Sequence, residues 1–141
     1  MEIQGLHIPD LLLKMLDTGR WPRDSAQALQ QNNRPLIPED RPRRFRRIYL
    51  HPPPFHTVAQ ILAGDGAGFY SQCGALHQLV PERVIEVADF GIGADSPILL
   101  EYSSGSSNPR VIYLEWPGQG RPNDWSVLAD DFSEFVEMLG V

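Results

Sequence analysis

Residues 84–116 read VIEVADFGIGADSPILLEYSSGSSNPRVIYLEW, and this stretch decides the fold. Three short runs within it are rich in β-branched and apolar residues: 84–90, 97–102 and 110–116. Gly91 and Gly93 interrupt the chain between the first two runs, and a Ser/Gly segment over 103–107 separates the last two. Because strands joined by short turns pair antiparallel, the stretch predicts a three-stranded antiparallel meander.

The turn after the first run contains the residues that we expect to shape the backbone. Gly91 and Gly93 allow backbone conformations that other residues avoid. Ser96 and Pro97 follow, and proline suits the first residue of a strand because it donates no ladder hydrogen bond. We therefore interpret Gly91, Gly93, Ser96 and Pro97 as a structural motif.

Helices are expected on both sides of the meander in the sequence. Apolar periodicity, capping residues and glycines predict them between Asp10 and Gly19, from Asp24 or Ser25 to Gln31, from Val58 to Ala63, from Phe69 to Leu79 and after Asp130 or Asp131. The last helix has an apolar stripe that comprises Phe132, Phe135, Val136 and Leu139. Further strands are expected over 45–50 and 125–128, whereas residues 34–44 are expected to form a loop. The prediction is an α+β fold, with a small antiparallel meander sheet of four to six strands and helices packed on it.

The composition indicates a single folded domain over 1–141. The chain is 42% hydrophobic and 21% charged, which supports a packed core and argues against disorder. We expect no membrane contact, because no run of about 18 apolar residues and no signal-peptide pattern is present. Cys73 is the only cysteine, which excludes an internal disulfide, so a cytoplasmic setting is expected. We expect its side chain to be small, buried and inert.

Charge is divided unevenly along the chain. Residues 1–50 hold nine basic and six acidic side chains, a net charge of +3, and residues 51–141 hold three basic and twelve acidic ones, a net charge of −9. The second half should therefore attract basic partners and repel nucleic acid phosphates.

Four short motifs carry a resemblance to a known family. They are Ile8-Pro9-Asp10, Asp89-Phe90-Gly91-x-Gly93-x-Asp95-Ser96-Pro97-Ile98, Asn108-Pro109-x-Val111 and Phe132-x-x-Phe135-x-x-Met138-Leu139. In these motifs the chain resembles the SUKH superfamily, which includes fungal cell-wall-assembly regulators and many bacterial toxin-immunity proteins. The resemblance is strongest from about Phe69 to the end and weaker before Arg20, whereas the Arg- and Pro-rich segment 20–68 departs from the commoner family pattern.

The resemblance implies a non-enzymatic protein-binding domain, such as an immunity protein that neutralises a bacterial toxin by binding it. The expected partner is then a protein with a basic surface, such as a toxin domain. We expect a partner-binding surface that comprises Asp89, Asp95, Glu101, Glu115 and Asp124, with Trp116 as its apolar anchor. The alternative is a regulatory module that binds a small molecule or a peptide. Trp125 is expected to fill the core beneath the final helix.

No residue pattern indicates catalysis, a metal site or a cofactor. The four histidines are His7, His51, His56 and His77, and their spacing is not that of paired metal ligands. His51 and His56 could converge across the intervening prolines, although a surface loop is the favoured interpretation. No serine lies in a nucleophile-elbow motif.

Five arginines lie within the seven residues 41–47. Three interpretations are open for this cluster: an exposed edge strand that arginines protect from edge-to-edge pairing, a contact with an acidic protein, and a contact with nucleic acid. We favour the edge strand, and the acidic second half of the chain disfavours nucleic acid.

Overall fold

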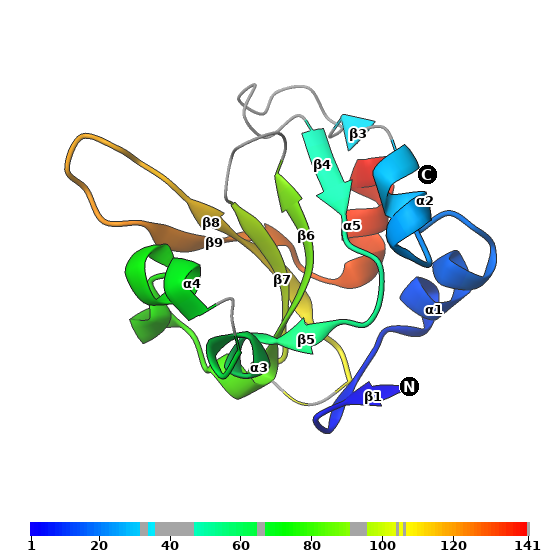
Figure 1. Cartoon of the computed structure of the whole chain (residues 1–141), viewed down its shortest axis with the longest axis horizontal. Coiled ribbons are helices and arrows are strands. Elements are labelled where there is room, and N and C mark those ends of the chain that lie inside the picture. The colour runs from blue at the N-terminus through cyan, green and yellow to red at the C-terminus, as the bar shows by residue number, and fades with distance from the viewer. Residues whose placement is uncertain are drawn as a thin grey trace.

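The structure, a computed structural model, describes residues 1–31, 34–35, 47–64, 67–90, 96–103, 105 and 107–140. In that part of the chain a seven-stranded antiparallel sheet lies between two groups of helices (Figure 1). The strands are β3 (Arg34–Pro35), β4 (Arg47–Leu50), β5 (His56–Thr57), β6 (Val84–Phe90), β7 (Pro97–Glu101), β8 (Arg110–Glu115) and β9 (Asp124–Ala129). Their order is β3-β4-β6-β7-β8-β9, and β5 also pairs with β6. A separate hairpin consists of β1 (Glu2–Ile3) and β2 (Leu6–His7).

The helices are α1 (Asp10–Asp17), α2 (Ser25–Gln30), α3 (Val58–Leu62), α4 (Ala67–Cys73) and α5 (Phe132–Leu139), with 3-10 turns η2 (Leu76–Gln78) and η3 (Pro81–Arg83). In Figure 1, α1, α2 and α5 lie to the right of the sheet, α4 lies at its left and α3 lies below it. The predicted α+β fold is confirmed, and five of the strands have four residues or more. Among the described residues, no helix is long and apolar enough to cross a membrane.

The predicted meander is present with antiparallel pairing throughout. β6 pairs with β7, and β7 pairs with β8, so that Leu99 lies opposite Glu86 on one side and Ile112 on the other. Pro97 is the first residue of β7, as expected, and its neighbour Ser96 is buried. The register between β6 and β7 shifts between Glu86 and Ala88, which marks a β-bulge in β6.

Alternate residues of the meander enter two separate apolar cores. Ile98 and Leu100 belong to a large core on one face of the sheet, together with residues of α1 and α5. Leu99 and Ile112 belong to a smaller core on the other face, with Val58 of α3 and Tyr70 of α4. Because successive side chains of a strand point to opposite faces, this sheet is covered by helices on both faces.

The local sequence signals explain most helix boundaries. Asp24 and Asp131 accept hydrogen bonds from the backbone N–H groups at the starts of α2 and α5, and Thr57 forms a capping box with Gln60 at the start of α3. All four residues of the predicted stripe in α5 are buried: Phe132, Phe135, Val136 and Leu139.

The prediction of one helix from Phe69 to Leu79 is wrong in its second half. Helix α4 ends at Cys73, because Gly74 packs tightly against the preceding turn. A Cβ atom at Gly74 would lie 2.7 Å from the carbonyl oxygen of Tyr70. Ala75 then adopts a left-handed conformation, and a short 3-10 turn follows.

The prediction of an exposed edge at residues 45–50 is also wrong for the part that the structure describes. Strand β4 lies inside the sheet, since β3 pairs with it on the side opposite β6. Residues 34–35 therefore form a strand within the expected loop. The arginines at 41–46 lie outside the described residues, so the contacts predicted for this cluster stay predictions.

Buried Tyr102 joins the N-terminal hairpin to the sheet. Its hydroxyl donates a hydrogen bond of 2.8 Å to the carbonyl oxygen of His7, ninety-five residues earlier in the chain. Burial raises the pKa of the Tyr102 phenol, so the hydroxyl keeps its proton and remains a donor.

We predict that Phe135→Ala lowers the free energy of unfolding by about 3–5 kcal/mol, because the Phe135 side chain is fully buried between α5 and the sheet. Chemical denaturation measures the change. The matched control is Glu137→Ala on the exposed side of the same helix, which should change stability by less than about 0.5 kcal/mol. Equal effects of both substitutions would contradict the packing of α5 on the sheet.

Candidate partner-binding site

The connection between β8 and β9 extends beyond the rest of the fold. Figure 1 shows this hairpin reaching past α4 at the left of the molecule. Its turn is a Gly/Pro-rich segment over 117–123, in which Gly118, Gln119 and Gly120 have positive φ angles. Arg121 N–H donates a hydrogen bond to the carbonyl oxygen of Gly118 and closes the turn. The hairpin therefore presents side chains away from both cores.

Three predicted partner-binding residues come together at the base of this hairpin. Glu115 and Asp124 lie opposite each other in the pairing of β8 with β9, and Trp116 follows Glu115 directly. The Trp116 side chain is 36% exposed and lies beside Phe69 of α4, with the ring centroids 6.5 Å apart. An exposed tryptophan is therefore held against α4, whereas alternation along the strand directs the Glu115 side chain to the opposite face.

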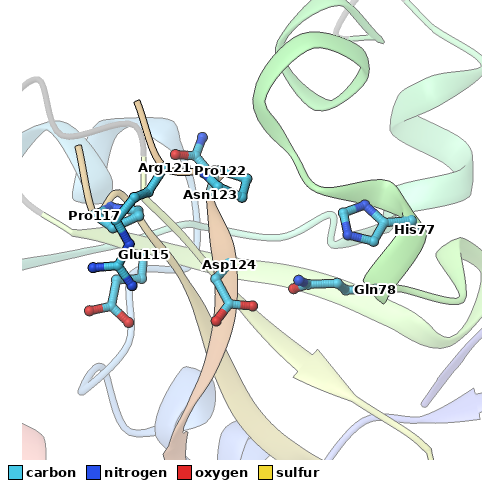
Figure 2. A pocket seen from close by; sticks show the side chains of 8 residues that line it. All are labelled: His77, Gln78, Glu115, Pro117, Arg121, Pro122, Asn123 and Asp124. Carbon is cyan, nitrogen blue, oxygen red and sulfur yellow. The ribbon is translucent and has the colours of Figure 1, made fainter. Parts of the chain in front are cut away.

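A polar hollow of about 260 Å³ lies between the hairpin and η2. Figure 2 shows the side chains that line it: His77, Gln78, Glu115, Pro117, Arg121, Pro122, Asn123 and Asp124. His77 and Gln78 face Asp124 across the hollow from η2, and the other labelled residues belong to the hairpin. Two carboxylates and one guanidinium thus line one surface depression, in which Glu115 Oε2 also accepts a hydrogen bond of 2.9 Å from the Ser126 hydroxyl.

Hydrogen bonds fix the hairpin to the segment after α4. The Asn123 side-chain amide donates to the carbonyl oxygen of Cys73 at 3.0 Å, and the Trp125 indole N–H donates to that of Gly74 at 2.7 Å. The backbone N–H of Trp125 donates to Gln78 Oε1 at 2.8 Å. Because both ends of these bonds belong to folded elements, the base of the hairpin is held in place.

Trp125 does not occupy the position that the sequence predicts. It packs against the smaller core with Tyr70 and Leu79, on the face of the sheet opposite α5. The expectation of a tryptophan beneath the final helix is therefore wrong. Trp21 is the tryptophan of the larger core, where it lies beside Phe132 and its indole N–H donates to the carbonyl oxygen of His51.

The other predicted partner-binding residues lie away from the hairpin. Glu101 forms an ion pair with Arg110 at the opposite end of β8. Asp89 lies on β6, where its carboxylate accepts a hydrogen bond from the backbone N–H of Ser96. Asp95 and the turn glycines Gly91 and Gly93 lie outside the described residues.

The sequence did not single out the contributions of η2 and of Asn123. His77 and Gln78 reach the hollow because α4 ends early, and their contact with the hairpin spans more than forty residues. The Gly/Pro-rich hairpin was a readable signal, but no local pattern reveals which segment packs against it. Cys73, expected to be buried, is only half-buried.

Comparisons with known proteins give no match: no family model, no curated protein and no solved structure is significantly similar to this chain. Among the described residues, no three His, Cys, Asp or Glu side chains are grouped as metal ligands.

We predict that Trp125→Phe loosens the hairpin while the rest of the fold stays intact. The substitution keeps an aromatic ring but removes the donor to Gly74, at a cost of about 0.5–1.5 kcal/mol. Hydrogen exchange should accelerate at the backbone amides of 116–124 and remain unchanged in α5. Val127→Ala, an exposed position on the same strand, serves as the control. Unchanged exchange in the hairpin would show that the indole bond does not hold it.

Proposed function

We propose that this chain is a non-enzymatic protein-binding domain that captures a basic partner with the base of the β8–β9 hairpin. The observation that carries the proposal is the exposed Trp116 at the base of a fixed hairpin, where the paired residues Glu115 and Asp124 add two carboxylates at the same end of the strands. Tryptophan is enriched among the interface residues that contribute most to binding energy, and it can anchor a contact from which water is excluded. The carboxylates at the base of the hairpin favour a basic partner surface over an acidic one.

The charge distribution supports the same assignment. Residues 51–141 have a net charge of −9, and all strands of the hairpin and the meander belong to this half. Long-range attraction of this kind accelerates encounter with a positively charged protein, and salt screens it. The specific role that we propose is that of an immunity protein that neutralises a bacterial toxin by binding it, and the SUKH-like motifs support this role.

The size of the hairpin hollow favours a protein partner over a small molecule. Its volume of about 260 Å³ is below the roughly 300–1,000 Å³ of typical ligand pockets, and most of its lining is polar. A depression of this kind fits individual side chains of a partner surface. The alternative, a regulatory module that binds a small molecule or a peptide, has less support from this geometry.

We predict that the two kinds of contact affect different steps of binding. The partner is captured from a lysate of the source organism, identified, purified and tested in a kinetic binding assay. Asp124→Arg should slow association by about tenfold at low ionic strength, because it reverses an exposed charge at the site. Trp116→Ala should accelerate dissociation, at a cost of about 2 kcal/mol or more if the tryptophan is the anchor.

The matched control for these variants is Glu137→Arg, which reverses an exposed acidic charge on α5 in the opposite helical layer. Its association and dissociation rates should remain close to those of the unmodified protein, apart from a small effect of the altered net charge on association. If Glu137→Arg weakens binding while Trp116→Ala and Asp124→Arg do not, the partner approaches the other side of the sheet. Purified protein that turns over a substrate would contradict the non-enzymatic assignment.

A further inference from the structure

A second hollow lies where the chain turns after β4. It has a volume of about 260 Å³, and its lining includes His51, Pro52, Pro54, His56, Ile61 and Glu86. The two prolines come from the turn, Ile61 comes from α3, and Glu86 projects from the middle of β6. The histidines thus converge on one hollow, although the loop interpretation of the sequence disfavoured this. Most of the wall is apolar, and Glu86 is the one carboxylate that contributes to it.

The Glu86 carboxylate is half-buried, and among the described residues one hydrogen bond holds it. The Tyr70 hydroxyl donates to Glu86 Oε1 at 2.7 Å. Burial, followed by the negative charge of Glu86, raises the pKa of the Tyr70 phenol, so this hydroxyl keeps its proton and stays a donor. In the part of the chain that the structure describes, no side chain donates to Glu86 Oε2, and this oxygen is not sealed from solvent. One carboxylate oxygen is therefore oriented, and the other is available to a ligand.

No cation of the described residues neutralises Glu86 at neutral pH. His51 lies close enough to interact with Glu86, but burial lowers the pKa of the imidazole more than Glu86 and a hydrogen bond to the Ala88 backbone raise it. His51 is therefore mostly uncharged at pH 7. A half-buried carboxylate that no described cation neutralises attracts a positive group to this hollow.

We propose that this hollow binds the cationic side chain of a lysine or arginine of a partner protein. The apolar walls suit the methylene stem of such a side chain, and the Glu86 carboxylate forms a charge-assisted hydrogen bond with its head group. The volume fits one side chain and is small for a typical ligand. This site gives the basic partner of the proposed function a specific point of attachment. The proposal rests on that function only in taking the cation to come from a partner protein.

The test is an NMR titration of the isotope-labelled full chain with three probes: Nα-acetyl-lysine methylamide, Nα-acetyl-arginine methylamide and the neutral Nα-acetyl-norleucine methylamide. We expect saturable shifts of the His51, His56 and Glu86 signals with at least one cationic probe, at a dissociation constant of about 10 mM, and none with norleucine. The two cationic arms identify the preferred head group. Equal shifts with norleucine would refute recognition of charge.

Glu86→Gln should abolish these shifts, and Tyr70→Phe, which keeps the carboxylate but removes its orienting donor, should weaken binding several-fold. The matched control is Glu82→Gln, which removes an exposed negative charge from nearby η3 and should leave binding unchanged. If Glu86→Gln does not fold, His56→Lys tests the site instead. His56 is exposed at the rim of the hollow, so the ammonium of a lysine at this position should occupy the site and prevent the probes from binding.

Binding that persists in both Glu86→Gln and His56→Lys, or cationic shifts confined to the β8–β9 hairpin, would overturn the proposal. The result is separable from that of the proposed function. If the probes bind here while no protein partner exists, the proposed function fails and the site stands. If a partner binds the hairpin normally but no probe perturbs the hollow, this proposal fails alone.

Discussion

The burial of the meander on both faces is the constraint on which the rest of the structure depends. Ile98, Leu99 and Leu100 have no exposed surface, although consecutive side chains of a strand point in opposite directions. Leu99 contacts the core under α3 and α4, and its neighbours contact the core under α1 and α5. A slip of one residue in register would exchange the side chains between two cores of different size and shape. The pairing of β6, β7 and β8 is therefore fixed from both sides.

This architecture leaves function to the edges and connections of the sheet. With both faces covered by helices, the two hollows proposed as binding sites lie at the β8–β9 hairpin and at the turn between β4 and β5. Each of these places is tied to a rigid element: the hairpin to the end of α4 through Asn123 and Trp125, and the second hollow to α4 through Tyr70 and Glu86. Glu86 also adjoins the bulge in β6, a feature that redirects side chains near functional sites. Helix α4 thus supports both proposed binding sites.

Local sequence signals were sufficient for the meander, for the caps of α2, α3 and α5, and for the apolar stripe of α5. Each of these is encoded by residues within a few positions of one another, so spacing and residue type reveal them. The prediction continued the helix past Gly74, although the approach of Gly74 to the Tyr70 carbonyl is a contact within one helical turn and glycine commonly follows a helix. The face predicted for Trp125 was wrong, because the alternation of side chains along a strand does not show which helices cover each face of the sheet. Glu86 was overlooked as a site residue, since a glutamate within an apolar strand has no motif of its own.

We propose that a partner approaches the hairpin and the turn after β4, and leaves the α1 and α5 layer uncovered. Hydrogen exchange of the chain, free and in complex with its purified partner, tests this claim most directly. The account predicts slower exchange at the amides of 115–125 and 51–57 in the complex, with α1 and α5 unchanged. Protection confined to α1, α5 or the N-terminal hairpin, with the β8–β9 hairpin exchanging as in the free protein, would contradict it.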